Sequence, residues 1–207
     1  MGTTRGEVVS AALQILDERG LDGLTMRAVA ERLGVQHNTV RWHAASKGRL
    51  LELASDELLA HCADEPLPRP WDERIWELSQ RLRAALLSRR DGARMITVAC
   101  GPDPHSLRYA EAVVSTLIGA GFDGRTASWA HWTIFYLTLG IAQEQQVSRD
   151  STGAVITADQ VPAERYPTLA ATLAHIGPGD FDQRFDFGLG LILDSLRARL
   201  AARSGTN

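Results

Sequence analysis

Residues 36–43 carry an unusual density of side chains that can hydrogen-bond to nucleic-acid bases. Asn and Gln amides pair with adenine, Arg pairs with guanine, and a Thr methyl contacts the thymine methyl. The polar side chains of this segment are Gln36, His37, Asn38, Thr39, Arg41 and His43. Val40 and Trp42 are left for packing. The composition predicts a helix that reads base edges in a major groove, and the alternative is an ordinary solvated helix.

A second helical pattern precedes this segment and is joined to it through one glycine. Thr25 can cap the start of that helix, and Gly34 supplies the left-handed residue that ends it. Its apolar residues recur at helical spacing: Met26, Val29, Ala30 and Leu33. Two short helices joined by such a tight turn are typical of a helix-turn-helix.

Positive charge is concentrated in the same region. Between residues 25 and 49 five basic residues face one acid, a local balance of +4, whereas the whole chain is at -3. The basic residues are Arg27, Arg32, Arg41, Lys47 and Arg49. Because phosphate neutralisation supplies most sequence-independent affinity, a mildly acidic protein with this distribution can still bind DNA.

These motifs carry a resemblance to the tetracycline-repressor (TetR) family of bacterial transcription regulators. Residues 9–59, with LDGLTMRAVAERLGV followed by TVRWH, resemble the family's DNA-binding domain. AALLSRRDGARM at 84–95 and FDFGLGLILDSLRARL at 185–200 resemble the ligand-binding domain of the tetracycline repressors. The resemblance implies phosphate contacts for Thr39, His43 and Lys47 and base choice for His37, Asn38 and Arg41. The full set of predicted DNA-contacting residues is Thr25, Arg27, Gln36, His37, Asn38, Thr39, Arg41, Trp42, His43 and Lys47.

Length and periodicity predict an all-α protein of two domains. A chain of 207 residues, 44% of them hydrophobic, can bury a sizeable core. We expect a three-helix helix-turn-helix domain with its connecting fourth helix at 1–63, and a larger helical ligand-binding and dimerisation domain at 64–207. The proline-rich segment 65–70 marks the boundary. With no long apolar stretch and no secretion signal, we expect a cytoplasmic protein without a membrane partner.

Capping signals and apolar spacing place the individual helices. Thr4 and Glu7 match a capping box, and Ser46 can cap the fourth helix, which carries Leu50 to Leu59. The first helix has the stripe Val8, Ala12, Ile15 and Leu16 and ends at Gly20. Later helices are expected at 71–89, 93–99, 105–120, 124–146, 163–176 and 181–202, with a loop at 148–161. The two cysteines, Cys62 and Cys100, are expected to be reduced and partly buried.

Residues 129–145 combine aromatic side chains with polar ones such as His131, a composition typical of a ligand pocket. For any single aromatic residue here, core or dimer packing remains the alternative. The predicted ligand-binding residues are His61, Gln80, Ile96, Cys100, Pro102, His105, Trp129, Trp132, Phe135, Tyr136 and Glu144.

Comparison with the tetracycline repressors also predicts a change of ligand. The tetracycline repressors that this chain resembles hold a magnesium-tetracycline chelate through a histidine of the sixth helix and a later glutamate. Ile96 stands at the histidine position and Glu144 at the glutamate position, while His61 matches another drug-contacting histidine. Isoleucine cannot ligate a metal, so we expect no metal, no cofactor, and an apolar or aromatic ligand with few hydrogen-bonding groups.

The last predicted helix has a wide apolar face that needs covering. Gly188 and Gly190 within it are easier to explain where another backbone approaches closely. The family resemblance implies a homodimer through this helix, by way of Phe185, Leu189, Ile192, Leu193 and Leu196; packing against the chain's own body is the alternative.

The function predicted from these features is a regulator, most simply a repressor, that binds a palindromic DNA operator as a homodimer and is released by a small-molecule effector. No G-x-S-x-G, HExxH or glycine-rich phosphate loop occurs, so no enzyme activity is expected. The remaining alternative is a small-molecule-binding or sequestering protein without regulatory DNA output.

Overall fold

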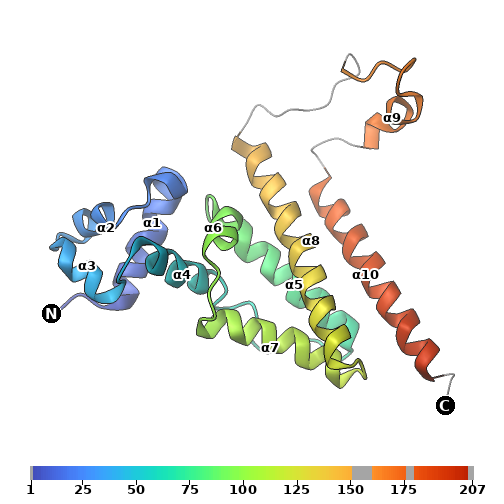
Figure 1. Ribbon diagram of the computed structural model, residues 1–207, viewed down its shortest axis with the longest axis horizontal. Coiled ribbons are helices and arrows are strands. Elements are labelled where there is room, and N and C mark those ends of the chain that lie inside the picture. The colour runs from blue at the N-terminus through green and yellow to red at the C-terminus, as the bar shows by residue number, and fades with distance from the viewer. Residues whose placement is uncertain (1, 151–159, 176–179, 205–207) are drawn as a thin grey trace.

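The computed structural model describes residues 2–150, 160–175 and 180–204. Over this part of the chain it contains helices and no strands, so the all-α prediction is confirmed (Figure 1). The helices are α1 (Arg5–Gly23), α2 (Met26–Leu33), α3 (His37–His43), α4 (Lys47–Leu58), α5 (Trp71–Leu87), α6 (Gly92–Ala99), α7 (Pro104–Gly119), α8 (Gly124–Asp150), α9 (Pro167–Thr172) and α10 (Phe181–Ser204).

Helices α1 to α3 and most of α4 enclose one core, which we call the reader core. The predicted capping box is present, with the Thr4 hydroxyl accepting a hydrogen bond from the Glu7 amide and Glu7 accepting one from Thr4. The stripe of α1 is fully buried, as predicted: Val8, Ala12, Ile15 and Leu16. Gly20 has φ 69° and interrupts the helix, but one more turn follows to Gly23. The first continuous helix therefore ends at Gly20 as predicted, and the turn to Gly23 follows across a kink.

Helix α4 begins where Ser46 was predicted to cap it, since its hydroxyl accepts a hydrogen bond from the Arg49 amide. Leu50 and Ala54 pack in the reader core, whereas Leu59, just beyond the helix, packs in a second core, which we call the body core. Met95 and Ala99 of α6 pack in the reader core. The two cores therefore meet along α4 and α6, and the division at residues 63 and 64 stays a prediction.

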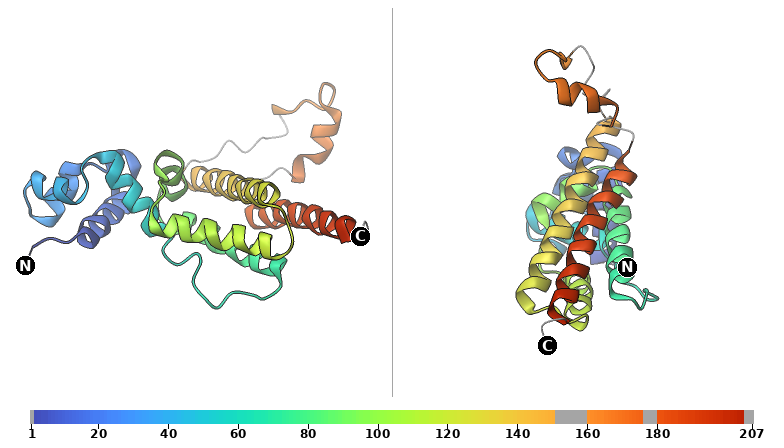
Figure 2. Two further views of the ribbon diagram at one scale, coloured as in Figure 1. Left: turned by 60° about the horizontal axis from the view of Figure 1, so that its bottom comes forward. Right: turned by 90° about the vertical axis from the view of Figure 1, so that its right-hand side faces the viewer.

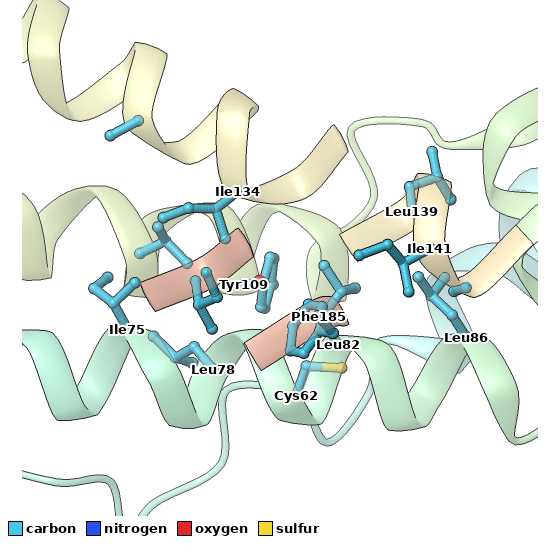
Figure 3. Packing of buried hydrophobic residues seen from close by; sticks show 14 of the residues in the cluster. Cys62, Ile75, Leu78, Leu82, Leu86, Tyr109, Ile134, Leu139, Ile141 and Phe185 are labelled. Carbon is cyan, nitrogen blue, oxygen red and sulfur yellow. The ribbon is translucent and has the colours of Figure 1, made fainter. Parts of the chain in front are cut away.

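The body core is formed by the long helices α5, α7, α8 and α10, which pack side by side (Figures 1 and 2). Figure 3 shows the apolar face of α5, whose residues Ile75, Leu78, Leu82 and Leu86 recur at helical spacing and are fully buried. Among the described helices, none combines the length and apolar character that a membrane span requires.

Two predicted boundaries were wrong. Helix α8 runs to Asp150, so residues 148–150 are helical, and the rest of the predicted loop up to residue 159 lies outside the described residues. The helix predicted at 163–176 begins only at Pro167, because proline lacks an amide hydrogen and disfavours helix in the residue before it. A short 3-10 helix, Leu173–His175, follows α9, and residue 176 is not described.

Candidate nucleic-acid interface and ligand cavity

Helices α2 and α3 meet in the tight turn that the sequence predicted. The Thr25 hydroxyl accepts a hydrogen bond from the Ala28 amide, and Gly34 has φ 65°. The Val35 amide then donates to the Ala30 carbonyl at 3.0 Å, which closes the end of α2. Val40 is fully buried in the reader core and anchors α3. This leaves the polar face of α3 at the surface.

None of the ten residues predicted to contact DNA is buried. Thr39 and His43 are half-buried, and the other eight are exposed. Trp42 corrects the packing expectation, because its side chain is 86% exposed. Side chains two positions apart in an α-helix differ by about 200° around its axis. Trp42 therefore points away from the core that holds Val40. The exposed face of α3 therefore includes a large indole beside Arg41.

Ion pairs reduce the positive charge that this surface offers. Arg27 pairs with Glu31 at 2.9 Å, and Arg32 pairs with Glu18 of α1. Arg49 is bound by Glu52 and by Asp103 of the body. Within the described chain Arg41 and Lys47 have no such partner, and both are exposed. The local balance of +4 thus overstates the free charge, which is centred on Arg41 and Lys47.

A cavity of about 310 Å³ lies in the body, next to the end of α4. Its walls come from four segments: the end of α4, the loop between α6 and α7, α7, and α8. The lining residues are Leu59, Cys100, Gly101, Pro102, Ser106, Leu107, Tyr109, Ala110, His131, Trp132 and Phe135. Four of the predicted ligand-binding residues, Cys100, Pro102, Trp132 and Phe135, are among them.

His131 is the central polar group of this cavity. Its ring lies 5.4 Å from that of Trp132 and 6.2 Å from those of Tyr109 and Phe135, between ring centroids. Burial lowers its pKa, so the imidazole is neutral at pH 7. Within the described residues its ring nitrogens have no hydrogen-bond partner. A neutral imidazole can donate one hydrogen bond and accept another, and both remain available to a ligand.

One other polar group of the wall, the Ser106 hydroxyl, already has partners within the protein. The Ser106 hydroxyl lies 2.7 Å from the Gly101 carbonyl and 2.8 Å from that of Asp103, so it holds the loop rather than facing a ligand. Tyr109 was missed from the sequence because it shares an apolar stripe with Val113 and Leu117, where it is indistinguishable from core. The cavity therefore suits an aromatic or apolar ligand with one or two polar groups.

Four of the predicted ligand-binding residues lie elsewhere, three of them bound by other polar side chains and one buried in the core. His61 is exposed, with Nδ1 2.7 Å from Asp64, and lines a separate crevice between α1, α4 and α5. Gln80 donates to Asp186 at 2.9 Å. Ile96 is buried in the body core. Glu144 is bound by Arg184 through both carboxylate oxygens, at 2.9 and 2.7 Å.

The remaining three predicted ligand-binding residues are near the cavity or on the outer face of α8, but do not line the cavity. The His105 amide donates to Asp56 of α4 at 3.0 Å. Tyr136 is exposed and stacks on Trp132 with ring centroids 5.5 Å apart. Trp129 is 65% exposed and lines a groove of about 500 Å³ between α8 and α10. One turn of helix thus separates the outward-facing Trp129 from the cavity-lining Trp132.

Four of the five residues predicted for a dimer interface are buried in the chain's own core, which corrects that prediction. Figure 3 shows Phe185 packed beside Leu82 and Cys62. A Cβ on Gly188 would lie 3.0 Å from Leu137, so the close approach at this glycine is α8 of the same chain. The four buried residues are Phe185, Leu189, Leu193 and Leu196, whereas Ile192 is half-buried and lines the groove beside Trp129.

The residues present do not fit the magnesium chelate that the resemblance implies. The hydrocarbon side chain of Ile96 is buried in the core, and the Glu144 carboxylate is occupied by Arg184. Within the part of the chain that the structure describes, no three His, Cys, Asp or Glu side chains come close enough together to hold a metal ion.

An exposed, polar second helix in a helix-turn-helix, attached to a helical body with an apolar cavity, defines a ligand-responsive DNA-binding regulator as the class of protein. Residues 8–54 match the family model of bacterial regulatory proteins of the tetR family, and residues 65–200 match that of the tetracyclin repressor-like C-terminal domain. The chain therefore belongs to the TetR family of bacterial transcription regulators.

Individual relatives agree with this assignment. The tetracycline repressor protein class A from transposon 1721 of Escherichia coli is 36% identical over 95% of this chain and 92% of its own length. The Streptomyces coelicolor TetR family protein ActR, solved in complex with actinorhodin, is 31% identical with a TM-score of 0.83, over 95% of this chain and 96% of its own. BioQ, solved with its double-stranded DNA operator, is 28% identical with a TM-score of 0.71, over 95% of this chain and 99% of its own.

Proposed function

We propose that this chain represses transcription by binding a palindromic operator as a homodimer, and that a small aromatic molecule in the cavity releases it. The observation that carries the proposal is the solvent-facing surface of α3, where Gln36, His37, Asn38 and Arg41 are exposed and Arg41 has no ion-pair partner in the described chain. Such side chains find matching groups on base edges in the major groove. Lys47 at the start of α4 supplies a phosphate contact.

A second copy of the chain would cover the outer face of α8 and α10. Three large apolar side chains are exposed there, with Phe187 69%, Trp129 65% and Leu191 57% accessible. Trp129 and Leu191 line the groove that Ile192 also lines. These residues replace the buried ones as the proposed interface. A symmetric dimer would set two α3 helices roughly 34 to 36 Å apart, one helical turn of DNA.

The effector proposed for the cavity is flat, aromatic and sparsely polar. Trp132, Phe135 and Tyr109 provide ring contacts, and the neutral His131 offers one donor and one acceptor. Actinorhodin, present in the ActR structure, is the first molecule to test. Tetracycline with magnesium is the contrasting probe, because Ile96 and Glu144 do not fit the chelate.

Selection of random duplex DNA by the purified protein at fixed near-physiological salt tests the DNA half of the proposal. We expect an enriched palindrome whose half-sites are one helical turn or slightly more apart. Absence of any enriched sequence, with and without candidate effectors, would favour the alternative of a sequestering protein.

Displacement from the selected operator tests the effector half. Actinorhodin is expected to weaken DNA binding, and tetracycline with magnesium is expected to leave it unchanged. Since linkage is reciprocal, the operator must weaken effector binding by the same factor. The scheme would be contradicted by an effector that changes the protein's affinity for the operator but binds the protein equally well with and without DNA. An effector that tightens DNA binding would make the molecule a corepressor.

A further inference from the structure

The loop between α6 and α7 forms one wall of the cavity and is also bound to the reader's fourth helix. Cys100, Gly101 and Pro102 line the cavity. The next residue, Asp103, accepts two hydrogen bonds of 2.6 Å from the Arg49 guanidinium of α4. The Asp103 carboxylate is almost completely buried, and the neighbouring guanidinium lowers its pKa, so this is a charged pair at neutral pH. Bidentate pairs of this kind are short and directional.

A second bond between the same two elements runs in the opposite direction. Asp103 is the N-cap residue of α7, but its side chain makes no capping hydrogen bond. The capping role is taken by Asp56 of α4, whose buried carboxylate accepts from the backbone amides of His105 at 3.0 Å and Ser106 at 2.8 Å. The two acids have exchanged partners: the cap residue of α7 holds α4, and an acid of α4 caps α7. Helix ends need such partners, so the cap that Asp56 provides is not readily given up.

We propose that this exchanged cap, formed by Arg49 with Asp103 and by Asp56 with the amides of His105 and Ser106, is the link through which the cavity sets the position of α4. The inference rests on the proposed function and names the residues that perform its coupling. A molecule entering between the loop and α8 displaces the backbone of Gly101 and Pro102. Because Asp103 and the start of α7 are bound to α4 by charge-assisted hydrogen bonds, α4 moves with the loop and carries the reader with it.

The other reader-body ion pairs provide the contrast. Arg94 binds Asp22 of α1 through two hydrogen bonds, at 2.9 and 3.2 Å, and Arg89 binds Asp17. None of these four residues lines the cavity. Arg49 is as exposed as Asp17, but its partner Asp103 is buried, whereas neither partner is buried in the other two pairs, so water and salt can replace those partners more easily. They attach the reader to the body without contacting the cavity wall.

Hydrogen exchange on the full chain, alone and with the selected operator duplex as the probe, tests this link. In the wild type, DNA is expected to slow exchange in α2 and α3 and also to change it about fivefold at residues 100–106, as loss of a charge-assisted bond would. In Asp103→Asn, α2 and α3 should still be protected while residues 100–106 no longer respond. Asp22→Asn, which removes a different reader-body ion pair, should respond as the wild type does. The charge-reversed pair Arg49→Asp with Asp103→Arg should restore the response.

The outcomes separate the two proposals. A loop response that persists in Asp103→Asn, or a wild-type loop that never responds although α2 and α3 are protected, overturns the link and leaves the proposed function standing. No protection of α2 and α3 at all would count against DNA reading. In that case the link is tested in the free protein. Asp103→Asn must speed hydrogen exchange in α4 and at residues 105 and 106, and Asp22→Asn must not. Equal exchange rates in the two variants would overturn the link.

Discussion

The DNA-reading surface and the ligand cavity are built in opposite ways. The surface comes from one continuous segment, and its side chains are left free, as Arg41 and Trp42 illustrate. The cavity comes from four separate segments, its lining is mostly apolar, and one of its few polar groups, the Ser106 hydroxyl, is bound within the protein. A surface that must match many bases is rich in unpaired polar groups, whereas a cavity for one small molecule gains specificity from shape and very few of them.

The largest expected effect is on the stability of the body, and it comes from adding a methyl group at Gly92. An added Cβ would lie 2.4 Å from the Leu86 carbonyl oxygen, so Gly92→Ala must push α5 and α6 apart. We expect the free energy of unfolding to fall by about 3 kcal/mol. Gly34→Ala in the reader meets open space but keeps φ 65°, and should cost about 1 kcal/mol. Urea denaturation of both variants measures the difference; equal losses would mean that crowding at the body junction is relieved cheaply.

Within the reading surface, base choice and general affinity should separate. Arg41→Ala is expected to relax preference at one guanine position and cost about 1 to 3 kcal/mol there, because a bidentate contact is lost. Lys47→Ala should weaken binding to all sequences alike and reduce the salt dependence by about one phosphate. Repeating the DNA selection with each variant measures both. An unchanged base preference for Arg41→Ala would refute its assignment to a base edge.

In the cavity, pH should act through His131. Burial lowers the pKa of the folded imidazole below its ordinary value of about 6.5. The unfolded chain therefore binds a proton at this histidine more readily than the folded chain does. Stability should be independent of this group above that value and fall as the pH drops below it, by at most about 1.4 kcal/mol per unit. His131→Gln should make denaturation curves between pH 7.5 and 5.5 less pH-dependent than those of the wild type. An unchanged slope in His131→Gln would contradict this assignment.

The smallest effect is expected where the sequence predicted a ligand contact that the structure places elsewhere. Glu144→Gln breaks an exposed ion pair with Arg184 and should lower the free energy of unfolding by no more than about 0.5 kcal/mol. Effector affinity should be unchanged, whereas Phe135→Ala in the cavity wall should weaken it. Titration of both variants with the same effector decides this, and a loss in Glu144→Gln would return that residue to the site.

The sequence predicted the reader well because its signals are local. Thr25, Gly34 and Val40 each act within a few residues, and the structure places all three as predicted. The cavity depends on which turn of each helix faces inward. Trp129 and Trp132 are three residues apart and look equivalent in the sequence, yet one lies on the outer groove and the other lines the cavity. That choice is made by the packing of α7 against α8, which no pattern along one helix contains.

The position of Phe185 illustrates the same limit. An apolar stripe at a chain end needs covering, but the pattern does not say by what. Leu137 of α8 lies against Gly188, so the chain covers the stripe itself. The side chains left for a partner, Phe187 and Leu191, are the ones between the stripe positions.

Met95 and Ala99 belong to α6 in the chain but complete the core around α1 and α4. A hybrid regulator made by joining this reader to a foreign body at residue 63 would lack both side chains and expose the apolar surface that they cover. Recombination between relatives would therefore preserve function only where the incoming α6 presents side chains of similar volume. The reader is therefore not a detachable module: transferring it with its core intact requires transferring part of α6 as well.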